Sequence, residues 1–525
     1  MSVSMPQSRA VNASRNVVFG VLMKAYQIVM PFIMRTCMIY FLGVEYLGLN
    51  GLFVSVLQFL NLAELGVGSA MVYSMYKPIA EKDNHTICAL LALYRRFYRV
   101  IGIVVLLLGL ALVPFLPYLV HDDIPSDLSL TTLYSLYLGG TVITYWLFAY
   151  KSSLLQAEQR SDVVSKVGIG VNTAMYAAQF LIIIFTGNYY GYVIAYVASL
   201  LATNIVSALC ASRLYPHIRP AGRLTKEEER EIAQRIRDLF TAKLGGVLLN
   251  SAPTVIVSAF LGLTVLAIYQ NYLFIVQSVT SLVGVVFTAC LASIGNSIVT
   301  ESAEKNYRDL RVFTLMMLWV IGFCTCCILC LSQPFMELWV GEGLMLEFTA
   351  VISFACYFLV FNATVLLTTF KDAAGIWHQD RFRPLATSVM SVILSLILIN
   401  WFGVYGVIVS TPISQTLIAL PWVLHNLFTY LFKRDMLLPY LKEFFYLLLV
   451  SAGACSLSWF ACFVVFLDPL LSFVIRFLIC LFVFNVVYIV FAIRLSEFVD
   501  MLLLVNRVTK GKFKFIEKGV KRLAK

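Results

Sequence analysis

Long apolar runs dominate this sequence and constrain its fold more than any other feature. A helix needs about 20 apolar residues to cross a bilayer, and only 13% of the 525 residues are charged. With a mean hydropathy of +0.87, the chain lacks the charge that would cover soluble domains of this length. We therefore predict an all-α polytopic membrane protein with fourteen transmembrane helices, at residues 17–42, 47–75, 100–120, 129–150, 164–186, 190–212, 244–262, 266–298, 312–333, 346–370, 384–402, 405–432, 443–466 and 470–493.

The basic residues predict the orientation of these helices. All but two of the 39 Lys and Arg residues fall on one side of the predicted spans, and the opposite loops carry only acidic charges, such as Glu45, Asp127 and Asp468. Lys and Arg concentrate in cytoplasmic loops, so both termini are predicted to be cytoplasmic. The net charge of +11 then reflects topology and contact with lipid headgroups, and no nucleic-acid partner is expected.

An internal repeat at an offset near 220 organises the chain. Each repeat holds six spans and begins in the cytoplasm, which predicts two parallel bundles around a central cavity, with substrate at their interface. The matching segments are Phe41-Leu42-Gly43 with Phe260-Leu261-Gly262, Lys24 with Lys243, and Lys151 with Lys371.

The repeat also predicts the domain boundaries. We expect a six-helix bundle over residues 1–214, a cytoplasmic linker over 215–243 and a second six-helix bundle over 244–432. Two extra helices follow over 433–495, and the chain ends in a basic amphipathic cytoplasmic tail over 496–525.

Charges inside the first predicted span are the strongest site candidates. Arg35 would lie about 10 Å, and Lys24 about 27 Å, below the outer end of the span at 1.5 Å per residue. Glu64 shares the depth of Lys24, which predicts a Lys24–Glu64 contact. Arg35 has no acidic residue at its own depth, and a buried cation is costly, so we expect Arg35, Lys24 and Lys243 to bind an anionic ligand.

Amides, prolines and glycines complete the candidate set. Intramembrane amides either hold helices together or line a path for a hydroxyl-rich cargo, and the sequence does not separate these two roles. Proline and glycine permit bends between rigid segments. The candidate lining residues are Asn50, Asn61, Asn250 and Asn271, and the candidate hinges are Pro31, Gly66, Gly68 and Pro253.

Motifs for common chemistries are missing from the sequence. It has no phosphate-binding Gly-x4-Gly-Lys-Ser/Thr loop and no Gly-x-Ser-x-Gly elbow, so a transporter is expected rather than an enzyme. Most of the twelve cysteines lie in apolar runs, and no His stands near Cys326 and Cys330. These thiols are interpreted as buried hydrophobes, and neither a metal nor a cofactor is expected.

Two segments resemble a known family. Residues 35–53 (RTCMIYFLGVEYLGLNGLF) and 63–81 (AELGVGSAMVYSMYKPIAE) are similar to the first two spans of bacterial polysaccharide-transport proteins, and residues 245–251 and Gly295-Asn296 also match. The resemblance implies the multidrug/oligosaccharidyl-lipid/polysaccharide (MOP) exporter superfamily. Its members place two six-helix bundles in a V, and this branch flips undecaprenyl-diphosphate-linked oligosaccharides.

The resemblance also implies partners and a location. The cargo would be a lipid-linked repeat unit for capsule, exopolysaccharide or O-antigen. It would cross the bacterial plasma membrane by alternating access through a monomer that contacts membrane lipids, glycosyltransferases and a polysaccharide polymerase. Family members often carry Asp after the Asn250-Ser251 pair, whereas this chain has Ala252-Pro253, so coupling to H⁺, to Na⁺ or to the membrane potential stays open. A multidrug or metabolite antiporter and a membrane-integral glycan polymerase or glycosyltransferase are the alternatives.

Overall fold

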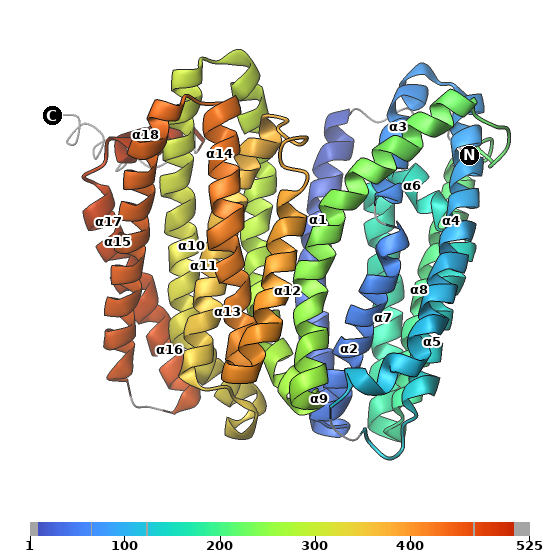
Figure 1. Ribbon diagram of the computed structural model, residues 1–525, viewed down its shortest axis with the longest axis horizontal. Helices are drawn as coiled ribbons and strands as arrows, with labels where there is room; N and C mark the ends of the chain where they lie inside the picture. The colour runs from blue at the N-terminus through green and yellow to red at the C-terminus, as the bar shows by residue number, and fades with distance from the viewer. Residues whose placement is uncertain (1–8, 65, 122–123, 466–467, 509–525) are drawn as a thin grey trace. The chain divides into compact units, whose positions relative to one another are not determined.

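The computed structural model describes residues 9–64, 66–121, 124–465 and 468–508. Those residues form helices and connecting turns, with no β-strand among them, as the apolar runs predict. The chain divides into two compact units, Met1–Gln270 and Asn271–Lys525. Figure 1 shows the helices of each unit in the colours of the chain.

The first unit is a bundle of long helices with two short interruptions. Its core is aromatic, with Phe53 and Tyr134 almost fully buried. Its elements are α1 (Arg9–Phe41), α2 (Val44–Leu60), η1 (Asn61–Glu64), α3 (Val67–Glu81), α4 (Asn84–Leu112), η2 (Val113–Leu119), α5 (Leu130–Trp146), α6 (Tyr150–Ala157), α7 (Ser161–Thr186), α8 (Tyr189–Leu214) and the part of α9 (Lys226–Thr300) that precedes residue 271.

The second unit is built from the remainder of α9 and the helices that follow it. Phe354 and Phe358 are buried in its core. Its further elements are α10 (Ala303–Val340), η3 (Glu342–Leu344), α11 (Phe348–Ala373), α12 (Arg383–Phe402), α13 (Val404–Ser414), η4 (Gln415–Ala419), α14 (Leu420–Tyr430), η5 (Arg434–Met436), α15 (Leu437–Phe463), α16 (Pro469–Ile479), η6 (Cys480–Phe484), α17 (Asn485–Ala492) and α18 (Ser496–Val508).

Ten helices among the described residues are long and apolar enough to cross a membrane, so the chain is a multi-pass membrane protein, and the count of fourteen stays a prediction. Several helices extend beyond the predicted spans: α4 begins at Asn84 rather than at residue 100, and α10 begins at Ala303 rather than at 312. The reason is physical. A run of apolar residues ends at the first charges, whereas helical hydrogen bonding continues through them into water.

Two spans predicted as continuous are interrupted. The predicted span 47–75 divides into α2, η1 and α3, and the predicted span 129–150 ends at Trp146, with α6 following after a break. Phe148 lies in that second break with φ 54°. Neither interruption contains a proline. A short break also changes the mean hydropathy of a span very little, so the apolar pattern did not predict either interruption.

Two glycines at equivalent positions of the internal repeat share one backbone conformation. Gly43 follows α1 with φ 130° and ψ 162°, and Gly262 divides α9 with φ 85° and ψ 176°. Positive φ with extended ψ is a region that glycine alone enters readily. The recurrence of Phe-Leu-Gly in the sequence therefore marks the same turn in both places.

The linker region joins the seventh predicted span without a break. Thr225 caps α9, since the amide of Glu228 donates to the Thr225 hydroxyl at 3.3 Å and the Thr225 amide donates to the Glu228 carboxylate at 2.9 Å. This reciprocal capping box starts the helix. From Lys226 the helix continues through Pro253 as far as the turn at Gly262.

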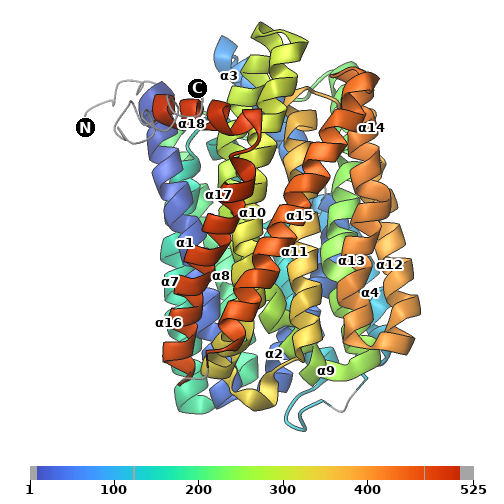
Figure 2. The ribbon, with the colours of Figure 1, turned by 90° about the vertical axis from the view of Figure 1, so that its left-hand side faces the viewer.

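The last described helix, α18, packs against α10 within the second unit (Figure 2). Arg308 of α10 pairs with Asp500 at 2.6 Å, and Arg311 pairs with Glu497 at 2.6 Å and with Glu443 of α15 at 2.5 Å. Glu497 is buried, so these pairs hold α18 onto α10. The predicted amphipathic tail beyond residue 508 lies outside the described residues.

Candidate functional site

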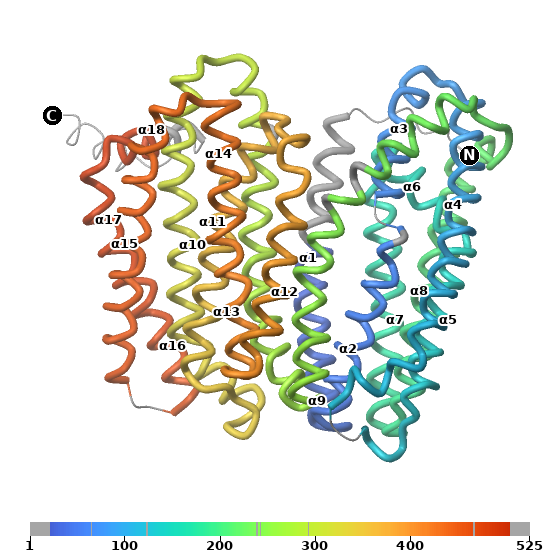
Figure 3. Tube along the Cα trace, viewed as in Figure 1, coloured from blue at the N-terminus to red at the C-terminus, as the bar shows by residue number. Residues whose placement is uncertain are grey.

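The interruption of the second predicted span creates the candidate site. Between α2 and α3, Gly66 adopts a left-handed conformation with φ 87°, which ends one helix and redirects the chain into the next. The Tyr94 hydroxyl of α4 lies 2.9 Å from the Val67 carbonyl oxygen and 2.7 Å from that of Gly68. It donates its proton to these backbone acceptors and so fixes the start of α3. Figure 3 follows α2 into α3.

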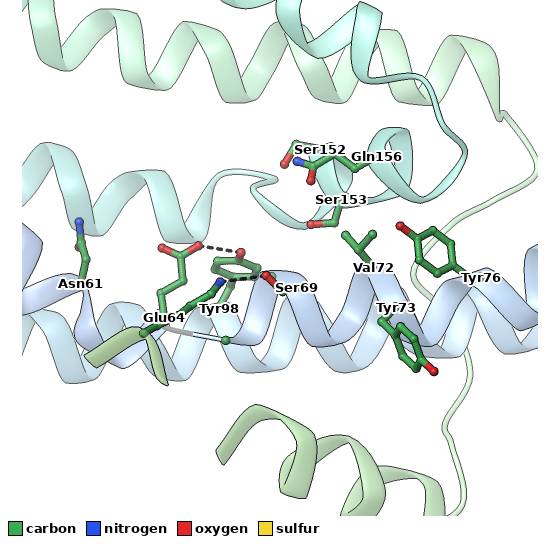
Figure 4. A pocket seen from close by; sticks show the side chains of 13 residues that line it. Asn61, Glu64, Ser69, Val72, Tyr73, Tyr76, Tyr98, Ser152, Ser153 and Gln156 are labelled. Carbon is green, nitrogen blue, oxygen red and sulfur yellow. Dashed lines mark hydrogen bonds between the residues drawn. The ribbon is translucent and has the colours of Figure 1, made fainter. Parts of the chain in front are cut away.

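A cavity of about 660 Å³ opens beside this interruption. Its wall comes from η1, α3, α4, α6 and α9, all inside the first unit. Figure 4 shows that hydroxyl, amide and carboxylate groups point toward the hollow. The lining residues are Asn61, Glu64, Gly66, Gly68, Ser69, Val72, Tyr73, Tyr76, Tyr98, Ser152, Ser153, Gln156 and Lys243.

Tyrosines surround the carboxylate of Glu64. The Tyr98 hydroxyl donates to Glu64 Oε1 at 2.9 Å, and its ring stacks on that of Tyr145 with centroids 5.9 Å apart. Tyr145 in turn donates to Asn61 Oδ1 at 2.8 Å. Hydrogen bonds to a carboxylate offset part of the cost of removing it from water. The half-buried Glu64 is therefore held in a fixed position in the wall.

Among the described residues that line this cavity, Lys243 is the only one with a cationic side chain. Its Nζ donates to Ser69 Oγ at 2.8 Å, while the ammonium itself is exposed. Further along α9, the Ser251 hydroxyl donates to Gln58 Oε1 of α2 at 2.6 Å. These two bonds attach α9 to both halves of the interrupted span. With Glu64 and Lys243 the wall holds one negative and one positive group.

Five of the residues selected from the sequence meet here: Asn61, Glu64, Gly66, Gly68 and Lys243. Lys24 is exposed on α1, and a Lys24–Glu64 pair is not among the ion pairs found between described residues. Glu64 bonds to Tyr98 instead. The predicted contact failed because equal depth in two helices does not make their side chains face each other.

The other candidates lie elsewhere. Arg35 is half-buried in α1 and interacts electrostatically with Tyr192 of α8. It does not line this cavity. Asn50 Oδ1 accepts a hydrogen bond from Tyr137 at 2.8 Å, and Asn250 donates to the Gly246 carbonyl of its own helix at 2.8 Å. Asn271 is fully buried in the second unit.

The two prolines selected as hinges do not interrupt their helices. α1 stays helical through Pro31, and α9 stays helical through Pro253. The glycine candidates differ: Gly66 has φ 87°, whereas Gly68 lies within α3. Of the four proposed hinges, Gly66 is therefore the one at which the backbone departs from a helix.

The polar wall from α6 was missed in the sequence. Ser152, Ser153 and Gln156 follow Lys151, at the point where the fourth predicted span was expected to leave the membrane. The chain turns back into a short helix there, so these residues reach the cavity. The signal was the four-residue spacing of Ser152 and Gln156, which places both on one helical face.

Cysteines in the second unit form the one group among the described residues with a geometry suited to a metal ion. The sulfur atoms of Cys326, Cys330 and Cys480 lie within 4.8 Å of one another. All three side chains are buried, as the apolar runs around Cys326 and Cys330 predict.

Comparison with known proteins agrees with this architecture. A family model described as "Polysaccharide biosynthesis protein" matches residues 13–292, and no curated protein sequence matches the chain. The lipid II flippase MurJ, in an inward closed conformation, superposes with a TM-score of 0.68 at 14% identity, covering 91% of this chain and 99% of that one.

Multidrug transporters share the fold as well. An inward-facing multidrug resistance MATE family transporter of the MOP superfamily has a TM-score of 0.62 at 13% identity, over 79% of this chain and 96% of that one. An outward-facing structure from the same family gives 0.53 at 15% identity, over 82% and 96%. Identities this low show the fold alone, and they confirm the predicted class of all-α polytopic transporter fold.

Proposed function

Because the chain belongs to the polysaccharide biosynthesis protein family of the MOP superfamily, we propose that it is a flippase for undecaprenyl-diphosphate-linked oligosaccharide repeat units. The cargo would move from the cytoplasmic to the outer leaflet of a bacterial plasma membrane. The observation that carries the proposal is the family match over residues 13–292. The hydroxyl- and amide-rich cavity in the first unit supports it.

The cavity chemistry suits the head group of such a lipid. Sugars present many hydroxyls, and Ser152, Ser153 and Gln156 offer matching donors and acceptors. The exposed ring of Tyr76 presents a flat face against which a sugar ring can pack, whereas the guanidinium of Arg235 lies 5.0 Å from the centroid of the Tyr73 ring. In our proposal the acyl chain stays in the lipid, and only the glycan and its diphosphate use a polar path.

Lys243 is the group in this wall that would attract the diphosphate. Its ammonium is exposed, and Ser69 is its one hydrogen-bond partner among the described residues, so an anion can approach without breaking an ion pair found there. A hydrogen bond to a charged group contributes about 1.5–3 kcal/mol. Arg35 and Lys24 remain candidates for later steps along the path.

An antiporter is the second candidate, and Glu64 is the observation that favours it. A fixed carboxylate in a polar cavity binds a proton or a cation, and related folds belong to multidrug transporters. In a flippase the same group would couple cargo movement to H⁺ or Na⁺, with the membrane potential as the alternative driving force, worth about 2.3 kcal/mol per charge per 100 mV.

The test uses a strain in which the native gene is replaced by variants at matched abundance. Lys243→Ala is expected to lower surface glycan about tenfold, the effect of losing roughly 1.4 kcal/mol, and to raise the pool of lipid-linked repeat units. Lys243→Arg should retain most of the export. Lys226→Ala, on the exposed first turn of the same helix, is the matched control.

Normal surface glycan in the gene deletion itself would overturn the flippase proposal. Normal glycan in Lys243→Ala alone would remove only the assignment of the diphosphate site. Lost resistance to cationic drugs with unchanged glycan in the deletion would establish the antiporter. For Glu64→Gln, we expect lower export in intact cells and an export rate that no longer responds to an imposed ion gradient.

A further inference from the structure

The second unit contains a buried group of thiols that transport does not explain. Cys326 and Cys330 lie one turn apart on α10, so both side chains face the same direction. Their sulfur atoms and that of Cys480 in η6 lie within 4.8 Å of one another. The three residues are 0–3% exposed. Two transmembrane segments therefore bring three soft donor atoms to a single point.

A third helix adds two more thiols. Cys455 and Cys462 are seven residues apart on one face of α15. The Cys455 thiol donates to the Gly322 carbonyl of α10 at 3.7 Å, and the Cys462 thiol donates to the Arg476 carbonyl of α16 at 3.8 Å. Both are buried. The five residues, which we call the thiol cluster, are Cys326, Cys330, Cys455, Cys462 and Cys480.

An arginine in the same part of the second unit supplies a positive charge. Arg476 is one of the two basic residues that fall outside the cytoplasmic pattern. Its guanidinium donates to the Val465 carbonyl at 3.1 Å, its buried Nε has no hydrogen-bond partner among the described residues, and its charge acts on Cys462. A cation inside the hydrocarbon is costly, and neutral thiols compensate it weakly. Thiolates in the cluster would balance its charge.

The backbone is distorted where the third ligand enters. Cys480 begins η6, a π-helical turn over Cys480–Phe484. Such turns are rare and are frequently found at functional sites. Here the wider turn begins at the residue that completes the group of three sulfur atoms.

From this geometry we infer that Cys326, Cys330 and Cys480 bind a thiophilic divalent cation, with Zn²⁺ as the test ion. Thiolates select soft metal ions, and structural zinc sites are tetrahedral with Zn–S distances of about 2.3 Å. The separations of up to 4.8 Å need only a small contraction to reach that geometry.

The charges of the assembly balance. Three thiols lose one proton each to solvent as the metal binds, and three thiolates with one divalent cation carry a charge of −1. Arg476 supplies +1, so the complex is neutral as a whole and tolerable in the hydrocarbon. The bound ion would fasten the α16–α17 segment to α10.

The first experiment measures metal in the intact purified protein. After treatment with a reductant and a chelator, the protein is incubated with Zn²⁺, desalted and analysed by mass spectrometry for metal content. We expect one equivalent of zinc. Replacing zinc by Co²⁺ should produce thiolate-to-cobalt absorption bands.

Matched serine variants locate the site. Cys326→Ser and Cys480→Ser should each lose the zinc and the cobalt bands. Cys324→Ser, on the same helix but outside the thiol cluster, and Cys210→Ser, in the first unit, should keep both. Wild-type protein that retains no zinc would overturn the inference. So would thiols that become reactive only after reduction, because that result would identify a disulfide.

Discussion

At the scale of single residues, Gly66 sets the geometry of the candidate cavity. Its φ of 87° lies in the left-handed region, which residues with a Cβ adopt at a cost of about 1–2 kcal/mol. Gly66→Ala should therefore destabilise the break between α2 and α3, lower the apparent unfolding temperature in detergent and reduce surface glycan.

Gly68 provides the matched control for this substitution. It lies within helix α3, and a Cβ added there would meet no atom within 4 Å. Gly68→Ala should leave the unfolding temperature and export close to wild type, and helix propensity favours alanine. Equal behaviour of the two variants would show that the left-handed turn has no role in transport.

The residue scale is also where sequence reasoning was most and least informative. Glu64 and Lys243 could be selected because a charged side chain in or near an apolar span is energetically costly and is therefore often functional. Both line the cavity. Lys24 was selected by the same rule, yet its side chain is exposed. This rule considers only the energetic cost of a charge in the membrane and its depth along the span. The direction of a side chain depends on how the helices pack, which the sequence of one span does not determine.

At the scale of elements, a buried charge network joins three helices of the second unit. Asp380 accepts from Arg383 of α12 at 2.8 and 2.9 Å, from Lys371 of α11 at 3.0 Å and from Asn426 of α14 at 3.3 Å. Lys371, Asp380 and Arg383 are each less than 10% exposed. Asp380 therefore pairs with two buried cations, and Lys371 also pairs with the partly exposed Asp372 at 2.5 Å.

Removing that carboxylate should be among the most damaging single changes. Asp380→Ala leaves Lys371 and Arg383 buried with like charges, and breaking a buried pair costs about 3–5 kcal/mol. We expect a large fall in the unfolding temperature measured in detergent. Asp372→Ala is the control, since Asp372 is 40% exposed beside Lys371 and exposed pairs contribute at most about 1 kcal/mol. A small effect of Asp380→Ala would mean that water reaches the network.

Element boundaries show what hydropathy could and could not predict. The apolar runs located the helices because burial in lipid requires them to be apolar and hydrogen-bonded. They could not place the breaks near Gly66 and Phe148, because a short interruption barely changes the mean hydropathy of a span. The break near Gly66 forms the cavity, and in the sequence it was indicated by the glycine, a candidate hinge, rather than by hydropathy.

At the scale of the whole molecule, the orientation in the membrane is the prediction with the broadest consequences. Basic residues follow one set of loops, and orientation depends on the number of Lys and Arg residues rather than on net charge. This distinction matters here, because Lys371 and Arg383 at one such loop are neutralised by Asp372 and Asp380. They still count toward orientation, since insertion precedes formation of the buried network.

Reporter proteins inserted into single loops test this orientation. Alkaline phosphatase needs disulfides that form outside the cytoplasm, so it should be active when inserted after Gly343, in the loop of η3, and inactive after Gly375, which follows α11. Green fluorescent protein should give the opposite pattern. Phosphatase activity at Gly375 would invert the molecule, placing Lys243 and the cavity at the outer face. A cytoplasmic lipid-linked donor could not then reach Lys243 first, and the proposed direction of transport would fail with it.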